Sequence, residues 1–344
     1  MSTYKEIRGL KVRDYTTNPD NPIEGQLWYN TTDQVARYRI PNKTAAWRTV
    51  ASTNTARRDS GGAGLYNSAL LTAGYVSDYS ILNESWNGTA WTEEGDTNIA
   101  RSNVDSVGAS SEAAILFAGY GPNPVGHRNE TESWNGSTWT EVNDLNTRVY
   151  GVGRAGTATA ALAYGGNLPP NNKTGETESW NGTSWTEVAD LNTVRENLAG
   201  DGTSTSAVVG GGYGPPGDGV ANTETWNGSS WTEVADLNQA RYDYASSGSS
   251  STANLVFGGY AGSTRYALTE QWNGSSWTEV GDLPVATNQQ ASAQASVSNA
   301  LSFAGYTGSN TANTFEWNST TPVGAWSTGS AMNTGRYQLG GAGS

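Results

Sequence analysis

Apolar residues occur along this chain in short runs that alternate with stretches rich in Gly, Asn, Ser and Thr. One such run, residues 206–209, is followed by three consecutive glycines, and Thr223–Trp226 and Trp231–Val234 come after a Pro- and Gly-rich stretch. Short apolar or alternating runs between turn residues are typical of β-strands. The pattern therefore predicts an all-β chain of short strands and tight turns, without helices.

The phrase Trp-Asn-Gly-x-x-Trp repeats along most of the sequence. Its first tryptophans are Trp86, Trp134, Trp180, Trp226 and Trp272, and a degenerate sixth copy runs from Trp317 to Trp326. Successive first tryptophans are 48, 46, 46, 46 and 45 residues apart. A period of about 40–50 residues is typical of one four-stranded blade of a β-propeller. Asn-Gly favours a tight hairpin turn, which we place between the third and fourth strands of each unit.

A pair of small residues closes the second predicted strand of every unit. It is Gly-Gly in three units, at 165–166, 211–212 and 258–259, and Ala-Gly in the other three. With a nearby tyrosine and the spaced tryptophans, this pattern resembles the kelch motif over residues 55–332. The resemblance implies a kelch-like β-propeller and says little about activity, because propellers host unrelated functions.

The two ends of the chain bear on the number of blades. Residues 25–29, 35–40 and 46–50 match the second, third and fourth strands of a unit, and residues 336–341 match the first. We therefore predict seven four-stranded blades spanning residues 25–344, with 25–50 and 333–344 forming a composite closing blade and 1–24 an N-terminal attachment segment. Closing the ring would remove exposed strand edges. The alternative is six blades and a separate N-terminal β-meander.

An arginine opens most units, and a glutamate lies two residues before the first tryptophan. Because a guanidinium binds a carboxylate with two parallel hydrogen bonds, and because five copies do not suit a single active site, we predict structural pairs within the blades. These pairs are Arg57 with Glu84, Arg101 with Glu132, Arg148 with Glu178, Arg195 with Glu224 and Arg241 with Glu270. The tryptophans are likewise expected to pack between blades and not to stack on sugars.

Charge and composition exclude several classes of function. The formal net charge is -13, which opposes binding to nucleic acid. The absence of cysteine and the presence of a single histidine leave the usual zinc and copper sites without ligands. Since no singular cluster of catalytic residues is visible, we expect no enzyme activity, no metal and no cofactor. No run of 18 apolar residues occurs, so we also expect no membrane insertion.

The connections after the second strands differ from unit to unit, whereas the strand phrases are nearly copied. In an antiparallel blade the 2–3 and 4–1 connections emerge on the same face of the ring, and varied loops on a rigid scaffold often carry function. The candidate binding residues on this face are Tyr79, His127, Arg128, Arg265 and Tyr266.

Residues 21–33 resemble a phrase of bacteriophage tail-fibre and other virion proteins, in which Glu-Gly, Tyr-Asn-Thr-Thr-Asp and a short β-meander follow one another. The resemblance implies a non-enzymatic virion structural protein (a tail fibre, spike or surface decoration) that is assembled in the host cytoplasm. Its partners would be other virion proteins and host surface glycans or a receptor, and it could form a homo-oligomer. Two alternatives remain. One is a bacterial carbohydrate-binding lectin or protein-interaction module. The other is a hydrolase or lyase, which would need a carboxylate or histidine cluster near the central channel, and no singular cluster is visible in the sequence.

Overall fold

A computed structural model of the chain describes residues 13–15, 27–32, 35–43, 45–122, 126–215, 217–319 and 322–328. The chain divides into two compact units, residues 46–318 and residues 1–45 with 319–344. In the described residues the regular secondary structure is entirely β, as the sequence predicts. Among these residues no helix has the length and apolar character needed to cross a bilayer.

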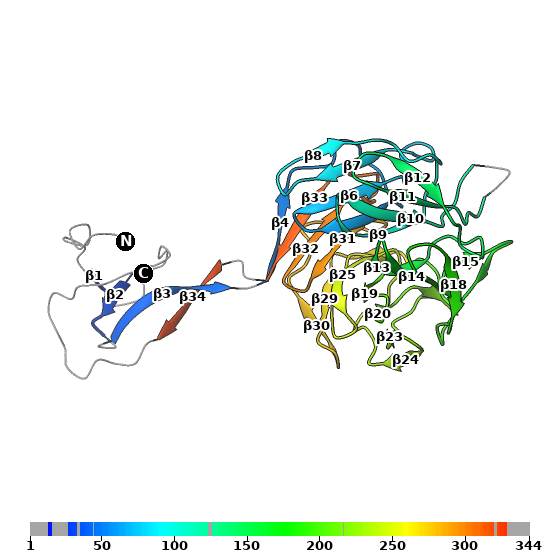
Figure 1. Cartoon of the computed structure of the whole chain (residues 1–344). Helices are drawn as coiled ribbons and strands as arrows, with labels where there is room; N and C mark the ends of the chain where they lie inside the picture. The colour runs from blue at the N-terminus through cyan, green and yellow to red at the C-terminus, as the bar shows by residue number, and fades with distance from the viewer. Residues whose placement is uncertain are drawn as a thin grey trace. The chain divides into compact units, whose positions relative to one another are not determined.

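Residues 46–318 form six four-stranded antiparallel sheets arranged as the blades of a propeller (Figure 1). Blades one to three are β5 (Gly61–Leu65), β6 (Ser68–Thr72), β7 (Asn83–Trp86) and β8 (Trp91–Glu93); β9 (Asp105–Ser110), β10 (Ala113–Phe117), β11 (Thr131–Trp134) and β12 (Trp139–Val142); and β13 (Gly153–Thr157), β14 (Ala160–Tyr164), β17 (Thr177–Trp180) and β18 (Trp185–Val188). Blades four to six are β19 (Gly200–Thr203), β20 (Ser206–Gly210), β23 (Thr223–Trp226) and β24 (Trp231–Val234); β25 (Ala245–Ser250), β26 (Ala253–Phe257), β29 (Thr269–Trp272) and β30 (Trp277–Val280); and β31 (Ala291–Ser296), β32 (Asn299–Phe303), β33 (Thr314–Asn318) and β4 (Ala46–Val50). The first strands of successive blades neighbour one another in a closed circle and line the central channel.

The Asn-Gly hairpins lie where they were predicted, but their turns are centred one residue later. In blade three the backbone N–H of Asn181 donates to the carbonyl oxygen of Ser184 at 3.2 Å, so Gly182 and Thr183 form the centre of the turn. Gly182 has a φ of +92°, a conformation that glycine adopts without a steric penalty. The side-chain oxygen of Asn181 accepts the N–H groups of Thr183 and Ser184, both at 2.9 Å. The asparagine therefore caps the turn from its first position.

The second tryptophan of a blade joins that blade to the one before it. Trp185 in blade three donates its indole N–H to the hydroxyl oxygen of Thr131 in blade two at 3.0 Å and meets Phe117 edge-on. The same bond is made by Trp231 to Thr177, Trp277 to Thr223, Trp47 to Thr269 and Trp91 to Thr314. These tryptophans are buried, at 5–8% exposure, so they pack between blades and offer no face to a sugar.

The prediction of seven blades was wrong, because the ring closes with six. Strand β4 pairs with β33 in the register Trp317↔Trp47, which repeats the Trp180↔Trp185 pairing of blade three. Residues 46–50 thus complete blade six, and Trp326, which had been assigned to that blade, lies in β34 (Pro322–Thr328). The alternative, six blades with a separate N-terminal meander, gives the correct number of blades. It differs from the structure in that β4, the last strand of that meander, belongs to the propeller. Residues 333–344, assigned to the composite blade, lie outside the described residues.

The second unit contains one four-stranded sheet in the order β1-β2-β3-β34. Its strands are β1 (Arg13–Tyr15), β2 (Leu27–Asn30), β3 (Val35–Lys43) and β34, and β1 pairs with β2 in parallel. Of the residues 25–40 that were predicted for a blade, the described strands β2 and β3 belong to this sheet instead. The predicted attachment segment 1–24 contributes β1 to the same unit.

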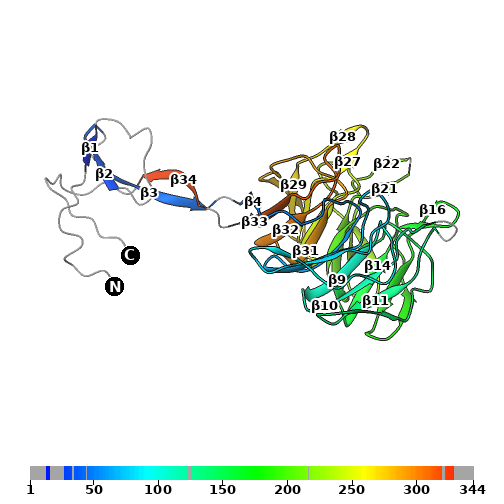
Figure 2. The same ribbon diagram turned by 90° about the horizontal axis from the view of Figure 1, so that it is seen from above.

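The propeller has two unlike faces. One carries the Asn-Gly hairpins of five blades, and we call it the hairpin face. In blade six the paired residues Ala46 and Asn318 take the place of that hairpin, so the chain enters and leaves the propeller there. The other, the loop face, carries the 2–3 and 4–1 connections. It includes three short ribbons, of which β21 (Tyr213–Gly214) with β22 (Asp218–Gly219) and β27 (Tyr260–Ala261) with β28 (Thr264–Arg265) lie next to each other, while β15 (Asn167–Leu168) pairs with β16 (Asn172–Lys173) (Figure 2).

Candidate functional site

A closed circle of backbone hydrogen bonds surrounds the mouth of the channel on the loop face. Each blade contributes one residue to this hydrogen-bond ring: Asp59, Asn103, Gly151, Asn197, Asp243 and Gln289. The N–H of each donates to the carbonyl oxygen of the ring residue in the preceding blade, over 2.7–3.2 Å, and Asp59 closes the circle by donating to Gln289. All six residues have φ values between +49° and +63°. Asn, Asp and Gly tolerate this left-handed conformation best, and five of the six ring residues, all except Gln289, are of these types.

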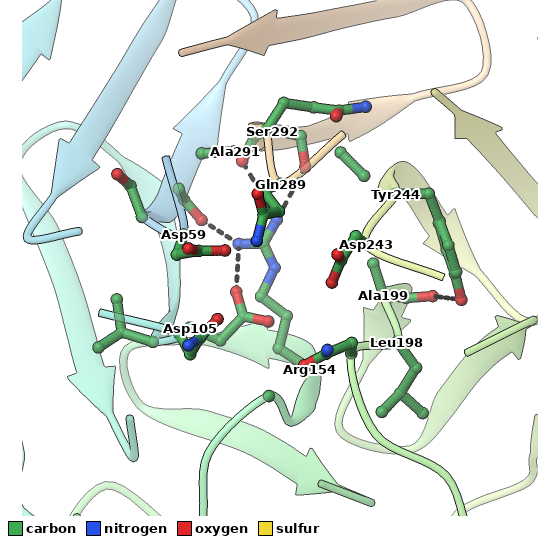
Figure 3. A pocket seen from close by; sticks show the side chains of 18 of the residues that line it. Asp59, Asp105, Arg154, Leu198, Ala199, Asp243, Tyr244, Gln289, Ala291 and Ser292 are labelled. Atoms are coloured by element: carbon green, nitrogen blue, oxygen red, sulfur yellow. Dashed lines mark hydrogen bonds and ion pairs between the residues drawn. The ribbon is translucent and has the colours of Figure 1, made fainter. Parts of the chain in front are cut away.

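A cavity of about 80 Å³ opens inside this ring. Figure 3 shows Arg154 of β13 at its centre, with Asp59, Asp105 and Asp243 around the side chain. The two Nη atoms of Arg154 donate to the carbonyl oxygens of Gly62, Ser106 and Ser292, so one side chain ties together blades one, two and six across the channel. Arg154 also pairs with Asp105 at 3.2 Å. The cavity is therefore lined by an arginine side chain that is 97% buried and held in place by these hydrogen bonds.

The carboxyl groups of the channel are held away from their ordinary ionisation range. Burial raises the pKa of Asp105 to about 6 and that of Asp59 to about 7, although Arg154 and Arg58 respectively oppose the rise. For Asp243, burial and the charge of Asp59 together raise the pKa to about 8. Deeper in the channel, burial raises the pKa of Asp201 to about 7. Near neutral pH the mouth therefore holds carboxyl groups that are part protonated and part ionised.

Half-buried tyrosines surround the ring, and we call them the tyrosine girdle. Its members are Tyr75, Tyr79, Tyr120, Tyr150, Tyr213, Tyr242, Tyr260 and Tyr306. Five of them pair through their backbone with the residue just before a ring residue, as Tyr120 does with Ser102, which fixes them at the mouth. Neighbouring rings meet at centroid distances of 5.0–6.2 Å within the girdle.

Three cations lie over rings of the girdle. The guanidinium of Arg58 lies 4.7 Å from the ring of Tyr75 and 5.1 Å from that of Tyr306, while Arg265 lies 5.0 Å from Tyr306. The ammonium of Lys173 lies 4.3 Å from the ring of Tyr213. The girdle thus combines flat aromatic surfaces with positively charged donors, in a chain whose net charge is -13.

The structure brings three of the five candidate binding residues to this girdle. Tyr79 lies between Tyr75 and Tyr120. Arg265 donates from Nε to the side-chain oxygen of Asn288 at 2.7 Å and covers Tyr306. His127 is buried beneath the surface, with its ring 5.5 Å from Tyr120 and 4.9 Å from Tyr150, so it supports the girdle from within.

The other two candidates lie elsewhere on the loop face. Arg128 forms an ion pair with Glu130 at 3.0 Å. Tyr266 takes part through its backbone, since its N–H donates to Gly259 and its carbonyl oxygen accepts from Thr287. Neither contact places these side chains in the girdle.

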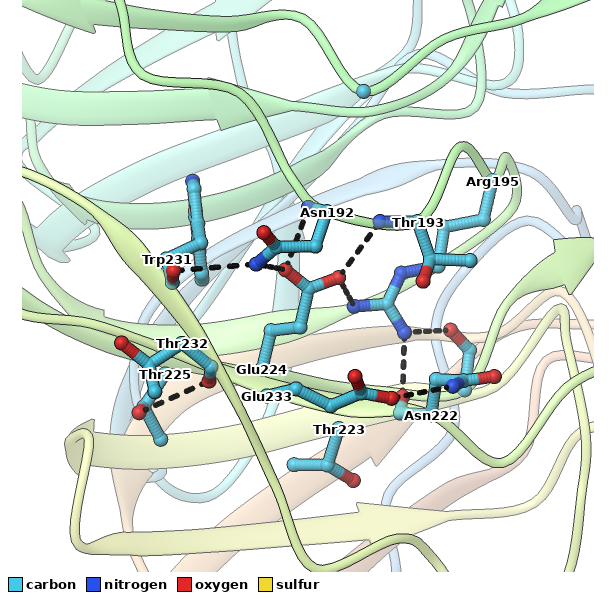
Figure 4. A network of polar contacts seen from close by, with 12 residues as sticks. Asn192, Thr193, Arg195, Asn222, Thr223, Glu224, Thr225, Trp231, Thr232 and Glu233 are labelled. Carbon is cyan, nitrogen blue, oxygen red and sulfur yellow. Dashed lines mark hydrogen bonds and ion pairs between the residues drawn. The ribbon is translucent and has the colours of Figure 1, made fainter.

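Four of the predicted arginine–glutamate pairs are found, and Figure 4 shows the one in blade four. Arg195 donates from Nη2 to Glu224 at 3.0 Å, and the same carboxylate accepts from the backbone and side chain of Asn192 on the connection from blade three. Arg57 with Glu84, Arg101 with Glu132 and Arg241 with Glu270 are paired in the same way. The arginine of each pair lies two residues before a ring residue, so the pair holds the 4–1 connection in place.

The predicted pair of Arg148 with Glu178 is absent, because the arginine of blade three stands one residue too early. Counting back two positions from the ring residue Gly151 gives Val149, which is buried where the other blades bury arginine, and Arg148 is exposed. Glu178 still accepts from Asn146, but burial without a guanidinium raises its pKa. A cavity of about 10 Å³ lies between Val149 and Glu178.

Sequence reasoning missed the ring and the channel. The six ring residues are not one residue type. Five of them are Asn, Asp or Gly, which tolerate a left-handed backbone, and the position two residues after the arginine could have been recognised in the sequence by this preference. Arg154 stands where other blades have Gly62, Ser106 or Ser292, so it could have been recognised as an unrepeated arginine in a first strand. Four of the six blades send an aspartate to the channel, and no singular cluster of this kind was visible in the sequence. Groups of acidic or histidine side chains arranged to hold a metal ion are absent from the described residues.

Comparison with known proteins identifies the fold and nothing finer. No family model matches the chain, and no curated protein matches it. Among solved structures, that of YjhT is similar with a TM-score of 0.63 over 77% of this chain and 96% of that chain, at 12% sequence identity. At this identity the likeness shows a shared β-propeller fold.

Proposed function

We propose that this protein is a non-enzymatic structural component of a bacteriophage particle, a tail fibre, spike or surface decoration, that binds its target through the loop face. The observation that carries the proposal is the tyrosine girdle with Arg58, Arg265 and Lys173 over its rings. Tyrosine and arginine are enriched at recognition surfaces, because their large rigid groups give contact area at a low cost in conformational entropy.

The geometry of the mouth favours binding over turnover of a small substrate. Sites that enclose small molecules have volumes of roughly 300–1,000 Å³, whereas the cavity at the mouth has about 80 Å³. Arg154 is held by the carbonyl oxygens of three blades, which makes it part of the framework. A target larger than the cavity would therefore rest on the girdle and reach only partly into the channel.

The second unit supplies the means of attachment to the particle. The phrase at residues 21–33 resembles one found in tail-fibre proteins, and the chain passes between this unit and the propeller at the hairpin face. Other virion proteins are the proposed partners of residues 1–45 and 319–344, and a homo-oligomer is one way to build that attachment. The kelch-like glycine pairs, such as Gly165 and Gly166 at φ +65° and +106°, belong to the same proposed family likeness.

The test measures binding of the fluorescently labelled full chain to candidate host cells. A variant with Tyr79→Ala, Tyr120→Ala and Arg265→Ala alters the girdle, and a matched variant with Thr89→Ala, Thr183→Ala and Ser275→Ala alters three hairpins. We expect saturable binding that falls at least tenfold in the first variant and is unchanged in the second. Antibodies against the chain should also label purified particles. Absence of both cell binding and particle labelling would contradict the proposal.

A bacterial lectin or protein-interaction module unrelated to phage is the second candidate. It is favoured by the near-repetition of one tyrosine position in five blades, at 75, 120, 213, 260 and 306. A lectin of this kind would bind several glycans per chain with similar affinities. Titration with a host oligosaccharide that gives one site per chain would disfavour it.

A further inference from the structure

Two arginines from different blades lie over the ring of Tyr306, a member of the tyrosine girdle. The guanidinium of Arg58 lies 5.1 Å from the centroid of this ring, and that of Arg265 lies 5.0 Å from it. Arg58 belongs to the connection that enters blade one, Arg265 to the ribbon of β27 with β28 in blade five, and Tyr306 to blade six. An aromatic face attracts cations through its quadrupole. Tyr306 therefore collects two positive charges at one place on the loop face.

Both guanidinium groups keep hydrogen-bond donors that the described residues do not use. Arg265 donates from Nε to the side-chain oxygen of Asn288 at 2.7 Å, and its two Nη groups have no acceptor in that part of the chain. Arg58 donates from Nη1 to Asn310 at 2.8 Å and pairs through Nε with Asp59 at 3.4 Å, which leaves its Nη2 unused. These Nη atoms are accessible to solvent, whereas the unpaired Nε atoms of the framework arginines are buried.

Two other cations of the loop face have their charge compensated within the chain. Arg128 pairs with Glu130 at 3.0 Å, and Lys173 pairs with Glu196 at 3.6 Å. Arg265 forms no ion pair among the described residues, although the whole chain has 32 acidic residues against 19 lysines and arginines. Its guanidinium is therefore positioned by a neutral amide and a ring, and its charge is left without a counterion.

The two carboxyl groups linked to this place by ion pairs or hydrogen bonds carry little charge near neutral pH. The side chain of Asn288 bonds to both Arg265 and Asp243, so an uncharged amide separates the guanidinium from that carboxyl group. Burial raises the pKa of Asp243 to about 8 and that of Asp59 to about 7. At pH 7 Asp243 is therefore mostly protonated and Asp59 partly so. The two guanidiniums form a positive area on a chain whose net charge is -13.

Charge and hydrogen bonding together select the class of ligand for this place. A cationic group would be repelled by the two guanidiniums. A neutral hydroxyl group could accept a hydrogen bond but would leave the positive charge uncompensated. A carboxylate or a phosphate accepts two parallel N–H bonds from a guanidinium, and such charge-assisted bonds are roughly twice as strong as neutral ones. An oxyanion is therefore the best match.

We propose that Arg58 and Arg265 bind an anionic group, a carboxylate or a phosphate, carried by a host surface glycan. The adjacent sugar residues of such a glycan would rest on girdle rings that no cation of the described residues covers, such as those of Tyr242 and Tyr260. The inference rests on the proposed attachment function and names the charge of its target.

Single substitutions separate the charge of Arg265 from its shape. Arg265→Gln removes the charge and keeps a hydrogen-bond donor, while Arg265→Lys keeps the charge and loses the planar fork. Arg148→Gln is the matched control, because Arg148 is an exposed arginine on a 4–1 connection of the same face and contacts no ring or carboxylate among the described residues. Arg58 is left unchanged, since its bond to Asn310 also joins blades one and six.

The experiment is saturation-transfer difference NMR of the full chain. Methyl glucuronide and glycerol phosphate are the anionic probes, methyl glucoside is the neutral probe and glucosamine the cationic one. We expect at least one anion to bind the natural chain at least tenfold more tightly than the glucoside and glucosamine. Its affinity should fall at least fivefold in Arg265→Gln, less in Arg265→Lys and not at all in Arg148→Gln.

Two further readouts sharpen this expectation. Affinity for the anion should fall as the salt concentration is raised, because salt screens exposed charges. A preference for the glucuronide assigns the site to a carboxylate, and a preference for glycerol phosphate assigns it to a phosphate. Unfolding temperatures of all variants show whether they are folded.

Three results would overturn the inference. These are no binding of either anion to the natural chain, anion binding that Arg265→Gln leaves unchanged, and binding of the glucoside or glucosamine that is as tight as that of the better anion. If Arg265→Gln then binds cells as the natural chain does, and Tyr79→Ala with Tyr120→Ala does not, the attachment function stands and the anion assignment fails. If the natural chain binds neither cells nor anions, both fail.

Discussion

The framework around the buried glutamates and the loop face around the channel mouth come from the same repeated unit and are built in opposite ways. In the framework, four blades bury an identical arginine–glutamate pair beside an identical asparagine bond. At the mouth, the six ring positions hold Asp, Asn, Gly, Asn, Asp and Gln, and their connections differ in length. The backbone ring is the same in each blade, so its side chains are free to differ. The repeated half therefore supplies the common framework, and under the proposed function the varied half supplies recognition.

Blade three shows how far the framework tolerates change. It buries Val149 in place of the arginine, and its ring residue nevertheless keeps both ring hydrogen bonds, at 3.2 and 2.8 Å. Because Glu178 is still held by Asn146 and Thr147, the connection to the ring stays in place. Substitution of the buried glutamate should therefore cost more stability in a blade that has the buried arginine than in blade three, which lacks it.

The largest effect of a substitution in the framework is expected from Arg101→Met. It leaves Glu132 buried without its guanidinium, and breaking a buried pair in this way costs about 3–5 kcal/mol of the free energy of unfolding. Arg148→Met changes the exposed arginine that opens the next unit and should alter the free energy of unfolding by about 0.5 kcal/mol or less. Denaturant unfolding of both variants measures the difference. Equal losses would contradict the assignment of arginines to framework and surface.

Two glutamates at equivalent positions sharpen the same comparison. Glu224→Gln removes the charge opposite the buried Arg195, whereas Glu178→Gln removes a charge that has no guanidinium partner and whose pKa is already raised. We expect the first variant to lose about 1–3 kcal/mol more than the second. Thermal and denaturant unfolding at pH 7 check the order, and the reverse order would show that Asn192 and not Arg195 holds Glu224.

The channel mouth should make stability depend on pH. The pKa of Asp243 rises from 3.8 to about 8 on folding, so between these values the folded chain holds a proton that the unfolded chain has lost. Stability present below about pH 4 is therefore lost as the pH rises towards 8, with a slope of at most about 1.4 kcal/mol per pH unit for one group. Asp243→Asn removes this dependence and should gain stability relative to the natural chain as the pH rises. Parallel curves for the two proteins between pH 4 and 8 would contradict a buried, protonated carboxyl group.

Among the contacts that the account assigns a role, the smallest change in stability is expected on the loop face. Tyr79→Ala removes contacts with Tyr75 and Tyr120 and should cost about 1 kcal/mol or less. Its effect on cell binding should exceed its effect on unfolding, in contrast to Arg101→Met. A loss of stability as large as that of Arg101→Met would place the girdle in the framework.

The sequence predicts the repeats, the four strands of each blade and the hairpins, because all of these depend on local patterns. It did not decide the closure, since Trp47 and Trp326 are equally good candidates for the strand that pairs with Trp317. The structure pairs Trp47 with Trp317 and places Trp326 opposite Arg39 in the other unit. The predicted pair of Arg148 with Glu178 was wrong because Arg148 lies one residue before the buried position. That position holds Val149, and the side chain of Arg148 is exposed. The channel could not be predicted, because Arg154, Asp59 and Asp243 lie in three different blades and meet only when the ring closes.

The central claim is that recognition belongs to the loop face. Hydrogen–deuterium exchange of the full chain, with and without saturating fragments of the host envelope, tests it most directly because each face is covered by its own peptides. The account predicts slower exchange in peptides that contain residues 73–80, 118–122 and 258–266, and unchanged exchange in those that contain the hairpins 87–90, 135–138 and 181–184. Protection of the hairpins with unchanged exchange at the channel mouth would contradict it.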